Sequence, residues 1–319
     1  MRKKEFKAYA LGGDGAKELI RYQKILPEIS EQAHESVVVL KRETQSKGDE
    51  QIGSGILIRT GDRLFLATAQ HVLSNWFQPN TPHTIRLSTS FGIFKLAGSA
   101  WIAAYDHPIG KEKLILDTAV LEITGELLTV GLEKSLGEIE ITSNSHDDLY
   151  VMAGYPLKLT TAPILNSTIY GLSIIPTALY GSRRISGQMA SVQIGDSIID
   201  DASLAFVYYG MKFENNTLSE MPSIRGISGG AVFRVLNCPL DVDSEIPEKL
   251  QLSIAGILIE TASRINDQPP LMIATNILVV SEMIKSLASE AARFSWESKQ
   301  IGRPISAAPY PLSIIPDEI

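Results

Sequence analysis

The chain has 319 residues, a formal net charge of −7 and one cysteine, Cys238, and 44% of its residues are hydrophobic. These values are typical of a soluble globular protein with enough chain for one large domain or two medium ones. A single cysteine excludes a fold built on internal disulfides. The mildly acidic balance argues against nucleic-acid binding, which needs a concentrated basic surface.

The first fifteen residues, MRKKEFKAYALGGDG, are basic but lack the continuous apolar stretch of a signal peptide. No run of 18 apolar residues occurs, so we expect no membrane-spanning helix and no membrane partner. Together with the cysteine count, these features predict a cytoplasmic protein.

Residues 16–34 show apolar side chains at roughly helical spacing, and Pro27 should break or kink that helix. We therefore predict a helical N-terminal arm over residues 1–35 that packs on the main body. A partly frayed extension is the alternative.

From residue 36 onward, short apolar and β-branched runs are separated by Gly, Asp, Asn and Pro, which is typical of strands. The runs lie at 37–40, 52–59, 64–68, 84–87, 93–97, 114–123, 150–153, 167–175, 189–194, 205–209, 231–235, 252–259 and 271–275. No helical pattern separates them, so an all-β fold is favoured over an alternating α/β fold. About a dozen strands exceed one small barrel. We therefore predict tandem antiparallel barrels over 36–142 and 143–276, dividing near 140–148.

The last segment, 277–319, begins with an amphipathic pattern that predicts a helix over 276–294. Prolines at 304, 309, 311 and 316 should keep the tail, 303–319, out of regular structure. The tail is then either extended on the surface or disordered.

Three short segments carry the residue types of nucleophilic catalysis. His71 follows an apolar run, Asp117 opens one, and Ser228 lies in a glycine-rich turn. Taken singly, they are explained equally well as a structural histidine, a turn-capping aspartate and a tight turn. Together they form a consistent set, because histidine can remove the proton of a serine hydroxyl during attack. Asp117 would accept the other imidazole N–H and stabilise the imidazolium.

These segments resemble the trypsin-like (chymotrypsin-fold) serine peptidases, whose patterns T-A-x-H, D-x-A-[VIL]-L and G-x-S-G-G match residues 68–71, 117–121 and 226–230. Residues 53–58 and 255–258 resemble the family's strands before the histidine and after the serine, so the resemblance covers about residues 36–290. It implies two six-stranded β-barrels with the active site between them and a C-terminal helix. It also implies a serine endopeptidase that cleaves polypeptides through an acyl-enzyme, with His71, Asp117 and Ser228 as the triad and no cofactor.

The resemblance assigns further site residues. The backbone N–H groups of Gly226 and Ser228 would form the oxyanion hole, and Pro222 would floor the specificity pocket, so we expect a small or apolar residue before the cut. The strand over 256–260 would pair with an extended substrate through Ile257, Leu258, Ile259 and Glu260. With His83, His107 and His146 spread over loops, we expect no metal site.

Ile227 stands where zymogen-activated members carry an aspartate that pairs with a newly cut N-terminus. Activation by such cleavage is therefore not expected, and either the turn is preformed or a ligand or regulatory protein partner orders it. The added arm and tail look like those of intracellular, bacterial-type members. The alternative is a catalytically inactive trypsin-like fold that acts as a binding or scaffold module, although a complete triad argues against it.

Overall fold

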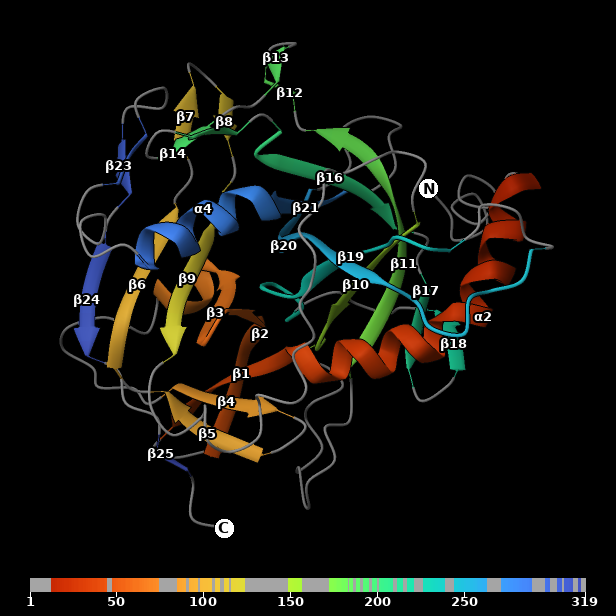
Figure 1. Cartoon of the computed structure of the whole chain (residues 1–319), viewed down its shortest axis with the longest axis horizontal. Coiled ribbons are helices and arrows are strands. Elements are labelled where there is room, and N and C mark those ends of the chain that lie inside the picture. Colours follow the sequence, from red (N-terminus) through yellow and green to blue (C-terminus); the bar gives the residue numbers. More distant parts are fainter. Residues whose placement is uncertain are drawn as a thin grey trace.

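Strands dominate the protein, as the short β-branched runs predict, and they form two antiparallel sheets with few helices (Figure 1). The all-β prediction is therefore confirmed. The computed structural model describes residues 13–44, 48–74, 85–89, 92–96, 98–104, 107–109, 112–114, 116–123, 149–156, 172–182, 184–185, 188–189, 192–194, 197–199, 201–208, 211–214, 217–220, 226–238, 244–262, 271–288, 296–298, 303–305, 307–311 and 315–316.

The N-terminal half contributes two helices and nine strands to the described residues: α2 (Gly13–Ser36), β1 (Val37–Thr44), β2 (Gly48–Thr60), β3 (Arg63–Ala69), α3 (Gln70–Ser74), β4 (Ile85–Thr89), β5 (Gly92–Leu96), β6 (Gly98–Ala104), β7 (His107–Ile109), β8 (Glu112–Leu114) and β9 (Thr118–Ile123). Most of these strands overlap the predicted runs. The strand β6 was not predicted, because the sequence GSAWIAA mixes small residues with few β-branched ones.

The second half contributes β10 (Leu149–Gly154), β11 (Ser173–Ser182), β12 (Arg184–Ile185), β13 (Gln188–Met189), β14 (Val192–Ile194), β15 (Ser197–Ile199), β16 (Ser203–Tyr208), β17 (Met211–Glu214), β18 (Thr217–Glu220), β19 (Ala231–Val235), β20 (Leu252–Ala262), β21 (Leu271–Asn276) and α4 (Ile277–Ala288). The tail adds β22 (Trp296–Ser298), β23 (Arg303–Ile305), β24 (Ala307–Pro311) and β25 (Ile315–Pro316).

The first sheet has the strand order β24-β6-β9-β3-β2-β1-β4-β5-β25 and curves as a half-barrel (Figure 1). The second has the order β10-β19-β20-β21-β16-β11-β17-β18, and β10 also pairs with β11. Six strands of the second sheet therefore form a closed ring. Apart from the tail strands, the first sheet uses residues 37–123 and the second uses 149–276, and the predicted boundary near 140–148 lies outside the described residues.

The helix α2 packs on the main body, and its apolar face is part of the core. The hydroxyl of Tyr22, a residue of α2, lies 3.0 Å from the Tyr150 carbonyl and 2.9 Å from the Thr177 carbonyl. These hydrogen bonds join the helix to β10 and β11. The helix is a single element with Pro27 inside it and bends along its length (Figure 1), so of the two predicted outcomes, a break or a kink, the structure shows a bend without a break. Proline can be accommodated within a bent helix because burial compensates the lost hydrogen bond. The buried face consists of Tyr22, Ile25, Leu26, Ile29 and Ala33.

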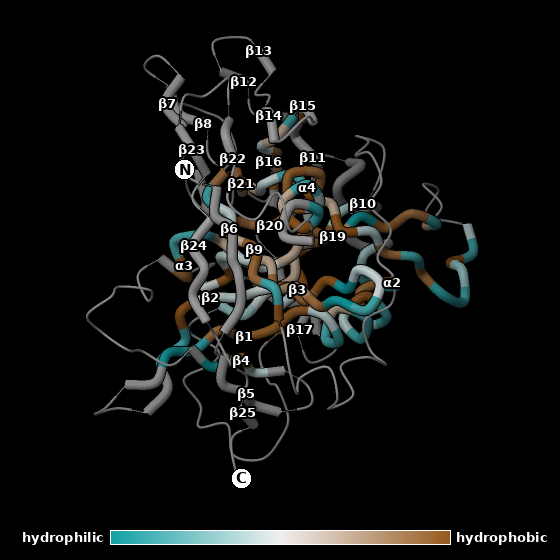
Figure 2. The backbone as a smooth tube through the Cα atoms, turned by 60° about the vertical axis from the view of Figure 1, so that its left-hand side comes forward, coloured by the Kyte–Doolittle hydropathy of each residue, from teal (hydrophilic) through white to brown (hydrophobic). Residues whose placement is uncertain are grey.

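The helix α4 follows β21 directly and confirms the predicted helix up to Ala288; residues 289–295 lie outside the described residues. Asn276 caps it, because its side-chain oxygen accepts the amide of Leu278 at 3.1 Å. Ile277, Val280 and Ile284 are buried, as the pattern predicts. They belong to a hydrophobic cluster formed by residues of α2, α4 and both sheets. Figure 2 shows the hydrophobic segments, in brown, in the interior of the molecule. No described helix is long and apolar enough to cross a bilayer.

The tail, residues 303–319, contains the short strands β23, β24 and β25, so the prediction that its prolines exclude regular structure is wrong. The strand β24 pairs with β6 and β25 pairs with β5, at the two outer edges of the first sheet. Proline is tolerated at a sheet edge because its missing N–H can face away from the neighbouring strand. Pro309 and Pro311 are two residues apart, so both direct their ring nitrogens to the same side of β24.

Candidate active site

The pairing of β3 with β9 brings His71 and Asp117 together. In that register Ala69 lies opposite Thr118. His71 follows Ala69 by two residues at the start of the short helix α3, and Asp117 immediately precedes Thr118. Residues 46 positions apart in sequence therefore become neighbours at one end of the first sheet.

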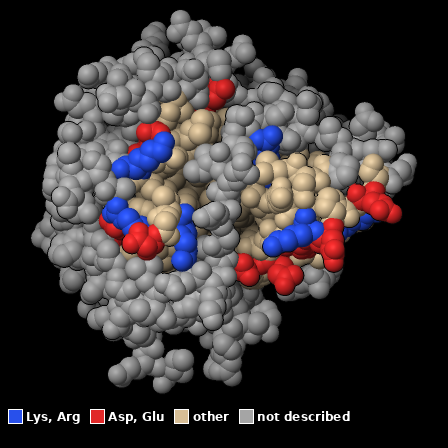
Figure 3. Space-filling view, viewed as in Figure 1, with Lys and Arg blue, Asp and Glu red and all other residues tan. Residues whose placement is uncertain are grey.

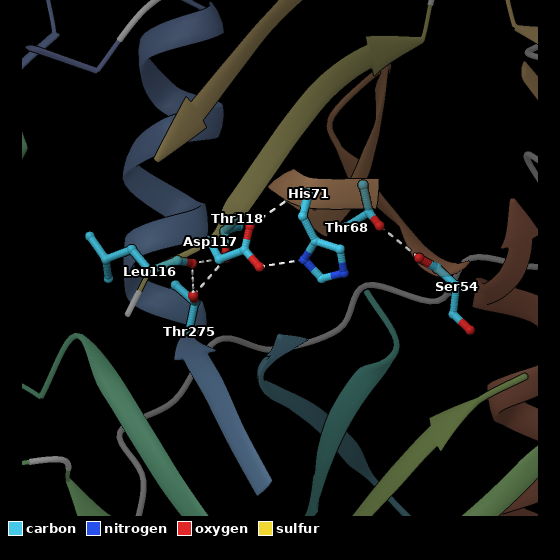
Figure 4. Close-up of polar contacts among 7 residues, drawn as sticks. All are labelled: Ser54, Thr68, His71, Leu116, Asp117, Thr118 and Thr275. Carbon is cyan, nitrogen blue, oxygen red and sulfur yellow. Dashed lines mark hydrogen bonds and ion pairs between the residues drawn. The ribbon is translucent and has the colours of Figure 1, made fainter. Parts of the chain in front are cut away.

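Three hydrogen bonds join Asp117 to the segment that carries His71, and Figure 4 shows the two that reach His71 itself. The Asp117 carbonyl accepts the Gln70 amide at 2.8 Å, and its Oδ1 accepts the His71 amide at 2.9 Å. Its Oδ2 contacts the imidazole Nδ1 of His71. Because a carboxylate only accepts, Nδ1 carries the hydrogen in this arrangement, and in the neutral ring Nε2 is then the nitrogen with the lone pair.

A pair of threonines holds the backbone around Asp117, whose φ of +21° is unusual for a residue other than glycine. The hydroxyl of Thr118 lies 2.6 Å from the Leu116 carbonyl and 2.6 Å from the Thr275 hydroxyl. The Thr275 hydroxyl also donates to the Leu116 carbonyl. Since Thr275 belongs to β21, the second sheet fixes the backbone of the aspartate that the first sheet carries.

Ser228 occupies the corner of a tight turn. The amide of Gly230 donates to the Ile227 carbonyl at 2.8 Å, and Gly229 has a φ of +85°. A positive φ at the third position is what a type II turn requires. Leu258 of β20 secures the turn, because its carbonyl accepts the Gly229 amide at 2.7 Å and its amide donates to the Gly230 carbonyl at 2.8 Å. The serine is thus held at a defined, partly exposed point.

Ile227 anchors the turn inside the closed ring. Its side chain is 2% exposed and packs in a cluster with Tyr150, Phe206 and other inward-facing residues of the second sheet. A Cβ at Gly154 would lie 2.4 Å from the Ile227 Cγ1, so the glycine leaves the space that the isoleucine fills. Burying such a side chain contributes about 1.5–3 kcal/mol. The turn is therefore held by the apolar burial of Ile227.

The serine turn also contacts β2, which packs against the segment that carries His71. The amide of Ser54 in β2 donates to the Ser228 carbonyl at 2.8 Å. A Cβ at Gly53 would meet Val72 at 2.7 Å and the Ser228 carbonyl at 3.0 Å. Since Val72 directly follows His71, the structure brings the segments of all three predicted triad residues to one place.

The Ser228 hydroxyl makes no hydrogen bond to His71 within the described residues. Such contacts are often long in a free enzyme and shorten when substrate binds. The side chains of His71 and Asp117 are 46% and 17% exposed, so the imidazole is accessible while the carboxylate is sheltered. Within the same part of the chain the Ser228 amide has no acceptor, and Gly226 has a φ of +88°.

The predicted substrate strand is only in part available. Ile257 pairs with β19 and β21, and Leu258 exchanges both backbone bonds with the serine turn. An added strand could therefore pair only from Ile259 onward, where β19 has ended. The side chains of Ile257, Leu258 and Ile259 are buried, so they contribute no open surface. Glu260 of β20 lies opposite Ile273 of β21. Pro222, the predicted floor of the specificity pocket, lies outside the described residues.

The sequence did not single out several residues that build the site: Ser54, Thr118, Thr275 and Tyr155. A serine or threonine within an apolar strand is the sequence signal that could have identified them. Such a hydroxyl is buried with the strand and therefore needs a hydrogen-bond partner. Tyr155 is fully buried, which raises the pKa of its phenol above the usual value, so the ring stays neutral beside the site. No group of three or more metal-ligating side chains occurs among the described residues.

No protein-family model matches the chain, and a comparison with curated proteins gives no match either. The fold and the site therefore define an all-β protein of two antiparallel sheets with a histidine–aspartate pair beside a serine turn. Any assignment of activity depends on the geometry of that site.

Proposed function

We propose that the protein is a serine endopeptidase that cleaves polypeptides with Ser228 as nucleophile, His71 as general base and Asp117 as the residue that orients the imidazole. The observation that carries the proposal is the bond from His71 Nδ1 to the Asp117 carboxylate, next to a serine turn bound to β2. This arrangement makes Nε2 the basic atom, and the serine turn is bound to β2 beside the segment that carries His71.

The chemistry follows in two steps. Ser228 Oγ attacks the substrate carbonyl carbon while His71 Nε2 takes the hydroxyl proton, and the Asp117 carboxylate stabilises the imidazolium. The amide N–H groups of Ser228 and Gly226 would donate to the oxyanion. The imidazolium then protonates the departing amine, the C–N bond breaks, and an acyl ester remains on Ser228. Water, deprotonated by His71, attacks this ester and regenerates the serine hydroxyl.

The arrangement of the two sheets supports a chymotrypsin-type fold of two β-barrels. The closed six-stranded ring holds the serine turn, the half-barrel holds His71 and Asp117, and the reacting groups lie where the two meet. The extended substrate would pair with β20 from Ile259 onward. Where Figure 3 colours the described residues, Lys and Arg lie among Asp and Glu and form no concentrated basic surface of the kind that binds nucleic acid.

The experiment compares hydrolysis of a broad peptide library by the wild type and by Ser228→Ala. We expect the wild type to cleave and the variant to lose at least about 10³-fold in kcat/KM while its melting temperature stays the same. A folded wild type that cleaves no peptide would contradict the proposal and favour a binding or scaffold module. Equal cleavage by the variant would show that another residue is the nucleophile.

A further inference from the structure

Ser54 occupies a junction between the two sheets. It lies in β2, its side chain is 0% exposed, and all its polar atoms are hydrogen-bonded. Two of its bonds reach the serine turn: the amide donates to the Ser228 carbonyl at 2.8 Å, and the hydroxyl donates to the Gly226 carbonyl at 3.2 Å. One residue therefore holds the carbonyls on both sides of Ile227.

The other two bonds fix Ser54 itself. The amide of Tyr155 donates to the Ser54 hydroxyl oxygen at 2.9 Å, so that oxygen already serves as an acceptor and its single proton is directed to Gly226. The Thr68 hydroxyl donates to the Ser54 carbonyl at 2.7 Å, and Thr68 lies three residues before His71 (Figure 4). Ser54 thus connects the turn of the nucleophile with the strand of the base.

The glycines around Ser54 leave no space for it to move. A Cβ at Gly229 would lie 2.0 Å from the Ser54 carbonyl oxygen, and one at Gly154 would lie 3.2 Å from its hydroxyl oxygen. Because a peptide group is planar, fixing the carbonyls of Gly226 and Ser228 also fixes the planes on either side of the 227–228 peptide. That peptide carries the Ser228 N–H, the predicted oxyanion donor.

We propose that Ser54 is a positioning residue that keeps the oxyanion turn formed before substrate arrives. The proposal rests on the proposed function, because an oxyanion turn has this role only in acyl transfer. Together with the burial of Ile227, the Ser54 hydroxyl replaces the ordering that an ion pair to a new N-terminus would supply. The turn then needs no cleavage and no activating partner.

The test replaces the hydroxyl alone in the full-length protein. Ser54→Ala is compared with the wild type and with Ser253→Ala, a buried serine of β20 that lies about 16 Å along the strand from Leu258. The readouts are kcat and KM on the best-cleaved peptide p-nitroanilide with a small or apolar residue before the cut. The inhibition constant of the matching peptide boronic acid, which forms a tetrahedral adduct on the serine, is the third readout.

For Ser54→Ala we expect kcat to fall about tenfold, the boronic acid to bind about tenfold more weakly, and KM to stay within about twofold. Ser253→Ala should match the wild type in all three. An unchanged kcat, or a raised KM with unchanged kcat, would overturn the proposal, since neither follows from a misplaced oxyanion donor.

A second variant keeps the proposal testable if the alanine protein does not fold. Ser54→Cys retains a side chain of similar shape with a much weaker donor, and we expect a kcat at least about threefold below that of the wild type. A wild-type kcat in the cysteine variant would also overturn the proposal. A wild type that neither cleaves nor reacts with a fluorophosphonate would instead refute the proposed function, and the role of Ser54 with it.

Discussion

The two halves of the candidate site are held in different ways. His71 and Asp117 lie at one end of the half-barrel, partly exposed, and directed hydrogen bonds join them. Ser228 lies on a turn that is held by a buried isoleucine and by glycines with no free space around them. Polar geometry alone therefore joins His71 to Asp117, whereas the position of Ser228 depends on tight packing as well as on hydrogen bonds. Substitutions of the His71–Asp117 pair should thus affect chemistry, and substitutions in the packing around the serine turn, such as those of its glycines, should affect stability.

The largest expected effect is that of Asp117→Asn, which keeps the shape of the side chain. An amide in place of the carboxylate favours the wrong imidazole tautomer and no longer stabilises the imidazolium, so kcat should fall about 10³- to 10⁴-fold. The melting temperature should change little, because the pair is partly exposed. Steady-state kinetics and thermal unfolding check both parts.

The matched control for that prediction is Glu122→Gln, which alters another carboxylate of the first sheet, bound to Arg63 far along β9 from the site. Its kcat should equal that of the wild type. If Asp117→Asn lowered stability as much as activity, the carboxylate would be a structural element and the contrast between the two halves would fail.

The next effect is on stability and concerns Gly229. In Gly229→Ala the methyl group would lie 2.0 Å from the Ser54 carbonyl oxygen and 2.1 Å from the Thr68 hydroxyl, at a φ of +85°. Left-handed strain and the forced shift of backbone together should cost about 3 kcal/mol of unfolding free energy. Denaturant unfolding measures it.

Gly61 provides the control, because it also has a positive φ, +61°, but a Cβ there meets nothing within 4 Å. Gly61→Ala should cost at most about 1 kcal/mol, since only the backbone preference is affected. Equal losses in the two alanine variants would mean that packing does not hold the serine turn.

The smallest effect is expected for Thr275→Val, which removes the hydroxyl that β21 contributes to the Leu116 carbonyl. Because the Thr118 hydroxyl still reaches that carbonyl, we expect a loss of about 1 kcal/mol in stability and a fall of a few-fold in kcat. The control is Thr177→Val, whose hydroxyl bonds to the Val207 carbonyl within the second sheet. It should lower stability by a similar amount without changing kcat, and a fall in kcat there would contradict the local role of Thr275.

Much of this arrangement is predictable from the sequence, because short β-branched runs identify strands such as β1, β3 and β19 by local pattern alone. The sequence predicts His71, Asp117 and Ser228 as site residues because each stands in a short segment that is specific when the three occur in order. The structure places the His71 and Asp117 segments together through the pairing of β3 with β9.

The remainder depends on register and on contacts between sheets. Nothing local distinguishes Ser54 or Thr275 from other small residues of apolar strands, and their bonds to Gly226 and Leu116 follow from how the two sheets meet. The choice between a break and a bend at Pro27 depends on similar contacts, since Tyr22 of α2 bonds to β10 and β11 and the helix continues past the proline. Contacts between residues so far apart in the sequence cannot be predicted from the few residues around each of them.

The most direct test of the central claim is to react the protein with a fluorophosphonate and locate the adduct by mass spectrometry of its peptides. The account predicts a single modified residue, Ser228, in the wild type, and at least about 10³-fold slower modification in His71→Ala, because the hydroxyl then lacks its base. Modification at another residue, or an unchanged rate in His71→Ala, would contradict it.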